Sequence, residues 1–180
     1  MATNRNTHHL TVGDRAHRIA AAMARETTTS DRASTALALT RCARSVFTAF
    51  PVEYRPREAF LDAVTAAGVY LRRFQPMGSW QLLDTELADG RNRFDLVHEN
   101  TETSVLVDEI KLGVGRCGEA AVQHQLDRYI EAGNRLWGSR FLGVRLCAVH
   151  EPLQSQLHLP DGRTVLPLTD KGLPDGVAVR

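Results

Sequence analysis

The sequence predicts an α+β fold in which helices precede a central mixed sheet and one later helix packs on that sheet. Three observations support this prediction. Apolar residues recur at helical spacing in the first 75 residues, the period becomes that of short strands after Gly78, and one helical pattern then precedes a buried strand. With 180 residues and 43% hydrophobic content, the chain can bury one sizeable core. We therefore expect one domain with an appendage.

Three helices are predicted in the N-terminal part. Asp14–Arg25 carries apolar residues at helical spacing and ends in turn-like residues. Asp31 or Ser30 can cap a second helix, which Pro51 ends. Pro56 opens a third helix, because its missing N–H costs nothing in a first helical turn.

Charge is divided unevenly along the chain. Residues 1–75 hold 11 basic and 6 acidic side chains, whereas residues 76–180 hold 11 basic and 15 acidic ones. We interpret residues 1–55 as a basic helical extension and residues 56–180 as the main domain. This imbalance suits a phosphate-binding surface beside an acidic metal site, although solvated helix faces produce the same imbalance.

The second part of the chain predicts a sheet interrupted by one helix. The expected elements are strands at Trp80–Leu87, Arg93–Glu99 and Ser104–Leu112, a helix at Glu119–Leu136, a strand at Phe141–Val149, and a final hairpin of Gln154–Leu159 and Thr164–Leu168 around Asp161-Gly162. Asp89-Gly90 and Asn100-Thr101 turns separate the first three strands, which predicts an antiparallel meander.

Composition excludes several classes of protein. Three widely spaced cysteines, an odd number, predict neither a disulfide framework nor a zinc site. No apolar stretch approaches the ~20 residues of a membrane helix, and residues 1–15 lack the apolar core of a secretory signal. We expect a soluble protein of the reducing cytoplasm with no membrane partner.

Glu109 and Lys111 give the clearest chemical signal. Alternate residues share one face of a strand, so this carboxylate and this ammonium point the same way, whereas Asp108 either supports the site or belongs to the other face. Lys111 and Lys171 are the only lysines among 22 basic residues, so a lysine inside an apolar strand suggests a site that needs a compact ammonium. Asp95, on the neighbouring predicted strand, can lie opposite Glu109.

Two carboxylates at such a short distance repel each other and need a cation between them. Hard oxygen ligands suit Mg²⁺ or Mn²⁺. Lys111 can then orient an attacking water or stabilise charge that develops on a phosphate. The pattern favours hydrolysis of a phosphodiester. In the alternative interpretation the strand simply emerges from the core into water, and Asp95, Glu109 and Lys111 are ordinary solvent-face residues.

The motifs resemble those of the PD-(D/E)XK nuclease superfamily, whose restriction-endonuclease-like αβββαβ core has the order of elements predicted above. Asp95 matches the first motif position, and Glu109-Ile110-Lys111 matches the (D/E)XK tripeptide. Gln125 and Tyr129 are similar to the QxxxY helix motif of the RecB-type branch, and their spacing puts them on one helical face. The resemblance covers residues 57–149, with Phe94 where the family name has Pro.

The resemblance implies a divalent-metal-dependent nuclease that acts on nucleic acid, expected to be DNA. It implies that water attacks in line beside Lys111 and that Gln125 and Tyr129 position the substrate. The implied ligands of Mg²⁺ or Mn²⁺ are Asp95, Glu109, Ile110 and Glu58, with Asp62 as the alternative to Glu58 for the acid that the family's first core helix often supplies.

Other interpretations stay open. Gly113–Gly118 matches the GxGxxG pattern of a dinucleotide site, but the strand before it ends in charged residues, and short turns join the strands upstream. A nuclease fold without turnover, acting as a binding or assembly module, is a second alternative. The Arg-rich front half alone suggests a helical DNA-binding regulator. A homodimer or a partner subunit is compatible with each of these.

Overall fold

The computed structural model describes most of the predicted sheet and parts of the N-terminal helices. The described residues are 15–22, 41, 43–45, 48, 57–76, 79–100, 103–112 and 119–165. The chain forms two compact units, Met1–Arg72 and Arg73–Arg180. The predicted boundary between residues 55 and 56 stays a prediction.

The N-terminal unit is helical wherever it is described. Residues 15–22 form a helix with Ala16, Ile19 and Ala20 buried, as the first predicted helix requires. Helix α3, Arg57–Arg73, begins directly after Pro56, as predicted. The buried side chains of α3 recur at helical spacing and are Ala63, Ala66, Ala67 and Tyr70. The second predicted helix lies largely outside the described residues, and those of its residues that are described are helical.

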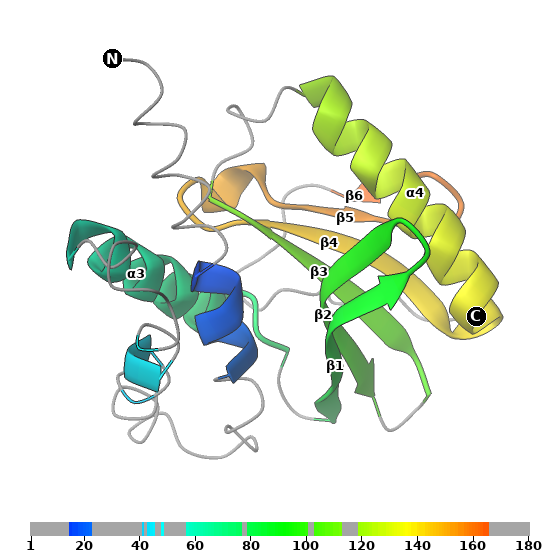
Figure 1. Ribbon diagram of the computed structural model, residues 1–180. Helices are drawn as coiled ribbons and strands as arrows, with labels where there is room; N and C mark the ends of the chain where they lie inside the picture. Colours follow the sequence, from blue (N-terminus) through cyan, green and yellow to red (C-terminus); the bar gives the residue numbers. More distant parts are fainter. Residues whose placement is uncertain are drawn as a thin grey trace. The chain divides into compact units, whose positions relative to one another are not determined.

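The C-terminal unit is built on a mixed six-stranded sheet in the order β1-β2-β3-β4-β5-β6 (Figure 1). Its strands are β1 Trp80–Asp89, β2 Asn92–Asn100, β3 Val105–Lys111, β4 Phe141–Ala148, β5 Gln156–His158 and β6 Thr164–Val165. Helix α4, Glu119–Trp137, joins β3 to β4. The predicted α+β class, with a mixed sheet, is therefore confirmed.

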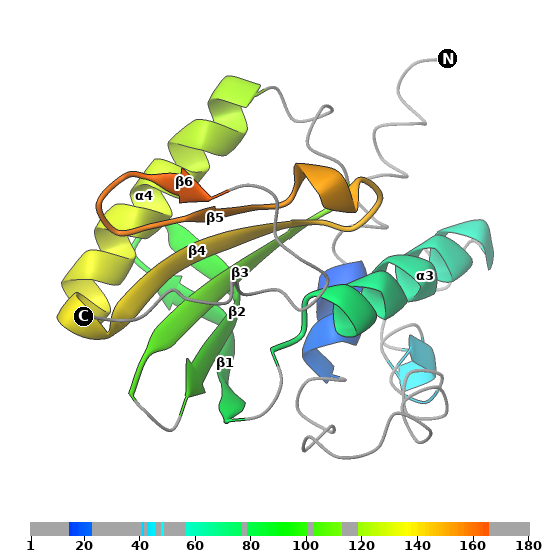
Figure 2. The ribbon, with the colours of Figure 1, turned by 180° about the vertical axis from the view of Figure 1, so that it is seen from behind.

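The pairing of the strands follows from the lengths of their connections. Short turns join β1 to β2 and β2 to β3, and both pairs are antiparallel. β3 and β4 are parallel, because the connection through α4 is long enough to return the chain to the same end of the sheet. Seen from behind, β4 continues into β5 and β6 (Figure 2), and both of those pairs are antiparallel.

The final predicted hairpin forms around Asp161-Gly162, but its first strand is shorter than expected. Residues 166–168 of its second predicted strand lie outside the described residues. A short 3₁₀ helix, η4 at Pro152–Gln154, occupies the place where the first strand was predicted to begin. Pro152 stands at the start of η4 and has no backbone N–H to donate to a neighbouring strand. Only three residues then remain for β5.

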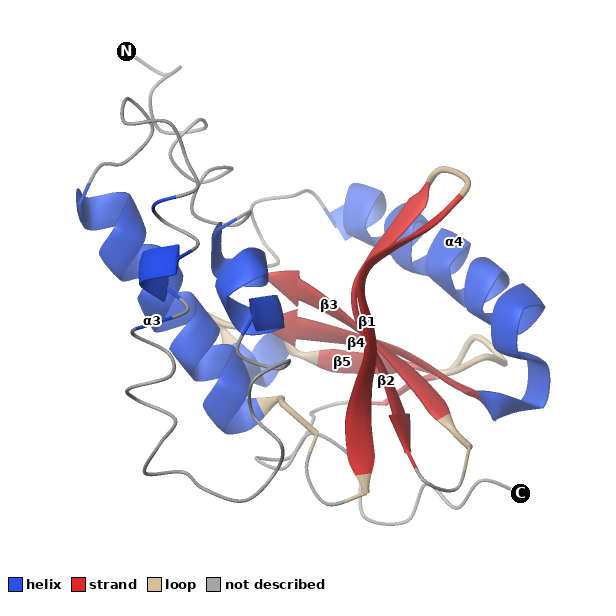
Figure 3. Ribbon diagram, turned by 60° about the horizontal axis from the view of Figure 1, so that its bottom comes forward, coloured by secondary structure: helices blue, strands red, loops and turns tan. Residues whose placement is uncertain are grey.

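Helix α4 packs along one face of the sheet (Figure 3), and this packing forms the hydrophobic core of the C-terminal unit. Val122, Leu126 and Tyr129 of α4 form one cluster with Val144 and Leu146 of β4. On the other face of the sheet, Leu106, Leu157 and Leu159 form a second cluster. With both of its faces covered, β3 is buried from Val105 to Ile110, including its acidic residues.

Two of the expectations from composition concern membrane helices and cysteines. No helix among the described residues is long and apolar enough to cross a membrane. Cys147 in β4 has a free, buried thiol, and burial raises the pKa of that thiol well above its ordinary value. Cys42 and Cys117 lie outside the described residues.

Candidate functional site

Asp95 of β2 reaches the tripeptide of β3 through the backbone. β2 and β3 pair in register from Leu96 opposite Asp108 to Glu99 opposite Val105, and the same register brings Asp95 opposite Glu109. At that point Asp95 Oδ2 accepts a hydrogen bond of 2.8 Å from the backbone N–H of Ile110. Only 5% of Asp95 is exposed. The carboxylate thus points to the middle residue of Glu109-Ile110-Lys111.

Glu109, Lys111 and Gln125 form one hydrogen-bonded cluster between β3 and α4. Lys111 Nζ lies 2.5 Å from Glu109 Oε1 and donates to Gln125 Oε1 at 3.0 Å. Gln125 Nε2 donates to the same Glu109 oxygen at 2.8 Å. A side-chain amide has a carbonyl oxygen that accepts and an NH₂ group that donates, so it can bind a cation and an anion at once. Gln125 therefore fixes both Lys111 and Glu109.

Tyr129 completes this cluster from the next turn of α4. Its hydroxyl accepts a hydrogen bond of 2.9 Å from Gln125 Nε2 and donates to the backbone carbonyl of Arg93 in β2. Burial, together with the negative charge of Glu109, raises the pKa of Tyr129 well above its ordinary value. Tyr129 therefore stays neutral, and its hydroxyl joins the helix to the strand that carries Asp95.

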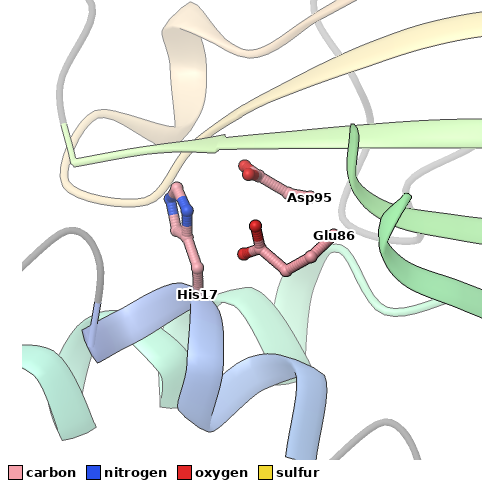
Figure 4. Close-up of side chains that lie close together, drawn as sticks. All are labelled: His17, Glu86 and Asp95. Atoms are coloured by element: carbon pink, nitrogen blue, oxygen red, sulfur yellow. The ribbon is translucent and has the colours of Figure 1, made fainter. Parts of the chain in front are cut away.

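β1 contributes an acid that was not singled out in the sequence. The hairpin pairs Leu87 with Phe94 and Thr85 with Leu96, which brings Glu86 opposite Asp95. One carboxylate oxygen of Glu86 lies within 4.8 Å of one of Asp95 (Figure 4). Figure 4 also draws His17, which belongs to the N-terminal unit. The predicted Asp89-Gly90 turn could have identified Glu86. A tight turn fixes the register of the two strands that it joins, and that register sets Glu86 opposite Asp95.

The backbone at Glu86 has a φ of 56°, in the left-handed region that a residue with a side chain rarely adopts. This conformation occurs inside a strand, at the position facing Asp95. Arg93 lies diagonally across the hairpin, and its Nε is 2.7 Å from Glu86 Oε2. The carboxylate of Glu86 is therefore close to both the carboxylate of Asp95 and the guanidinium of Arg93.

The oxygen donors around Asp95 suit a hard divalent cation. Asp95 and Glu86 offer carboxylates at a separation that one ion can bridge. The N–H of Ile110 is directed at Asp95, and in an extended strand the carbonyl of the same residue points to the same side. Glu109 follows on the same face of β3 as Lys111. Oxygen ligands of this kind are those that Mg²⁺ and Mn²⁺ prefer.

Glu58, the sequence-based candidate for the helix acid, lies exposed in the first turn of α3, and Asp62 is exposed one turn later. Both belong to the N-terminal unit and form no part of the geometry of the C-terminal unit. Their role as metal ligands stays a prediction.

Asp108 belongs to the other face of the sheet. Arg145 of β4 donates to both of its oxygens, from Nε to Oδ1 at 2.8 Å and from Nη2 to Oδ2 at 2.6 Å, and His98 Nε2 lies 3.4 Å from Oδ2. Burial alone would raise the pKa of Asp108, but the Arg145 charge and the His98 hydrogen bond outweigh burial and hold the pKa far below its usual range. Asp108 is thus a permanently charged partner of Arg145.

The glycine-rich segment Gly113–Gly118 lies outside the described residues. β3, α4 and β4 around it form a parallel crossover, which is also the connection of a dinucleotide-binding unit. However, β3 ends in the cluster of Glu109, Lys111 and Gln125 instead of an apolar strand end. The antiparallel pairing of β1, β2 and β3 also differs from the parallel sheet of that fold.

Five of the sequence-based site residues thus lie together within one unit: Asp95, Glu109, Lys111, Gln125 and Tyr129. Ile110 joins them through its backbone, and Glu86 adds an acid. No protein-family model, no curated protein and no solved structure matches this chain. The chemistry of these side chains is therefore the basis for assigning a function.

Proposed function

We propose that this protein is a divalent-metal-dependent nuclease of the PD-(D/E)XK type that hydrolyses phosphodiester bonds of nucleic acid, expected to be DNA. The observation that carries the proposal is the hydrogen bond from Ile110 N–H to Asp95, which joins two buried acidic strands beside the Glu109–Lys111 pair. The element order α3, β1, β2, β3, α4, β4 supports a restriction-endonuclease-like core.

Asp95, Glu86, Glu109 and the carbonyl of Ile110 are the donors for Mg²⁺ or Mn²⁺. When bound, such an ion lowers the pKa of a water and neutralises charge on the phosphate. The separation of Asp95 and Glu86 supports this assignment, because two carboxylates that close favour a cation that both can share.

Lys111 is the residue that acts on the reacting groups. Its ammonium is held by Glu109 and Gln125, and 19% of its side chain is exposed, so a water or a phosphate oxygen can approach Nζ from the solvent side. Donation from Nζ orients the attacking water and stabilises the charge that develops on the phosphate. Gln125 fixes the direction of the ammonium, and Tyr129 fixes Gln125.

Cleavage of plasmid and linear DNA with Mg²⁺ or Mn²⁺ tests this proposal. We expect the wild type to cut, EDTA to stop cleavage, and Lys111→Ala to lower the rate by about 10²-fold or more, the size of effect seen when one charge-stabilising donor is lost. Lys171→Ala is the matched control, because it removes the only other lysine. Wild-type protein that cuts neither DNA nor RNA with either metal would contradict the proposal.

A binding or assembly module without turnover is a second candidate, favoured by one observation. Glu109 Oε1 is already engaged by both Lys111 and Gln125, so this carboxylate is neutralised without a metal. Nucleic acid binding that weakens with salt, unchanged by EDTA and without cleavage, is the result expected for this candidate. The two functions therefore differ in their dependence on metal as well as in turnover.

A further inference from the structure

Arg93 is connected to the proposed site by both its backbone and its side chain. Its backbone carbonyl accepts a hydrogen bond from the Tyr129 hydroxyl, and this bond fixes the backbone from which the Arg93 side chain extends. Its guanidinium pairs with Glu86 at 2.7 Å, yet 63% of the Arg93 side chain is exposed, against 32% for Glu86. Arg93 thus combines a fixed backbone with a guanidinium that can move.

The ion pair between Arg93 and Glu86 is of the kind that exchanges readily. Exposed pairs contribute little to stability, because water and salt screen them and two long side chains must be ordered. Glu86 also has a carboxylate oxygen within 4.8 Å of Asp95, and two carboxylates that close favour any cation nearby. Arg93 therefore supplies positive charge at the carboxylate that a metal ion is proposed to use.

We propose that Arg93 binds a phosphate of the substrate, and that it is held on Glu86 until a divalent cation takes that carboxylate. This inference rests on the proposed nuclease function. The cation and the guanidinium are alternatives at Glu86, so metal binding releases Arg93. The forked donors of a guanidinium match the oxygens of a phosphodiester.

The position of Arg93 on β2 fits this role. Arg93 and Asp95 are two residues apart on one strand and so share a face of the sheet. A phosphate held by Arg93 is therefore close to the phosphate attacked beside Asp95. If the ion pair of Arg93 and Glu86 only stabilises the hairpin, a different response is expected. Removing Arg93 would then leave metal affinity unchanged or weaken it, and would not affect nucleic acid binding.

The first measurement is Mn²⁺ affinity without nucleic acid, followed by the electron paramagnetic resonance signal of free Mn²⁺. Arg93→Ala is expected to bind Mn²⁺ about two- to fivefold more tightly, the range equivalent to one exposed ion pair. Arg135→Ala is the matched control, because it removes an arginine that pairs with Asp89 of the same hairpin. This control is expected to keep the wild-type affinity.

The second measurement is the affinity for a fluorescein-labelled DNA duplex and for its single strand, by anisotropy with Ca²⁺ in place of Mg²⁺. Arg93→Ala is expected to bind about tenfold more weakly, and the slope of log affinity against log salt is expected to fall by about 1 for the lost phosphate contact. Arg93→Gln, which keeps the length of the side chain, serves as a second variant, and the melting temperature of each variant checks that it folds.

Tighter Mn²⁺ binding together with weaker DNA binding by Arg93→Ala supports the proposal. Unchanged or weaker Mn²⁺ binding by Arg93→Ala, or unchanged DNA affinity, overturns the role of Arg93 and leaves the nuclease function standing. A wild type that binds no Mn²⁺, or binding that persists in Asp95→Asn, overturns the proposed function as well.

Discussion

At the scale of single residues, Asp108 and Arg145 form the most deeply buried ion pair among the described residues, since neither side chain is exposed. Asp108→Asn leaves the arginine charge buried without its counter-charge. Breaking a buried pair on one side costs about 3–5 kcal/mol, so we expect a loss of that size in the free energy of unfolding, measured with urea. Asp161→Asn breaks the exposed pair with Arg163 and is expected to change little. Equal effects of the two substitutions would contradict this account.

His158 gives the protein a pH dependence near neutrality. Its side chain is buried, its Nδ1 lies 3.3 Å from Thr164 Oγ1, and its Nε2 has no hydrogen-bond partner among the described residues. Burial lowers its pKa below 6.5, and the negative charge of Asp127 opposes this only in part. Because the unfolded chain takes up the proton at a higher pH than the folded one, the contribution of His158 to stability is complete above about pH 6.5 and is lost as the pH falls toward the folded pKa.

The pH dependence of unfolding in the wild type and in His158→Gln checks this expectation. Histidine titrates between about pH 7.5 and 5.5. Over this range the free energy of unfolding of the wild type should fall more than that of the variant. His150→Gln, which replaces an exposed histidine, is the control and should follow the wild type. A variant whose stability falls as steeply as that of the wild type would rule out His158 as the source.

At the scale of elements, α4 approaches the start of β4 at Gly133. A Cβ added there would clash with the ring of Phe141, so Gly133→Ala forces that ring or the helix to shift. Helix propensity alone predicts that this substitution stabilises the protein by up to about 1 kcal/mol. We expect a destabilisation of about 1–3 kcal/mol from overpacking instead, and the sign of the change in melting temperature distinguishes the two. Phe141→Leu, added to Gly133→Ala, should recover part of the loss.

The elements themselves could be predicted because the signals for them are local. The spacing of apolar residues and the two turn sequences lie within short windows, and they gave β1, β2, β3, α4 and β4 within a few residues of their observed ends. The predicted strand at Gln154–Leu159 was longer than β5, because nothing in its alternating pattern signalled the 3₁₀ turn at Pro152. A pattern of apolar residues shows that a segment can form a strand, and hydrogen bonding to neighbours decides how much of it does.

The candidate site could be predicted only in part. Glu109 and Lys111 share a face by strand geometry, and Gln125 and Tyr129 by helix geometry, so each pair was accessible from spacing alone. The partner of Asp108 was not, because Arg145 is 37 residues away across the α4 crossover. Which strand lies beside which, and in what register, depends on the packing of the whole sheet.

At the scale of the molecule, metal binding should be visible in global stability. An ion that binds only the folded chain stabilises it by about 2.7 kcal/mol at a concentration 100 times its dissociation constant. We expect Mn²⁺ to raise the melting temperature of the wild type, and to raise it less in Glu86→Gln and in Asp95→Asn. Glu99→Gln, an acid of the same strand as Asp95 that pairs with Arg140, is the control and should respond as the wild type does. An equal rise in all four proteins would place the ion elsewhere.

The free thiol at the centre of the sheet makes large motions of this unit measurable. Cys147 is fully buried and its pKa is raised, so an alkylating reagent reaches a reactive thiolate only when β4 separates from its neighbours. In a chain that carries Cys42→Ser and Cys117→Ser, the rate of alkylation therefore reports how often the sheet opens.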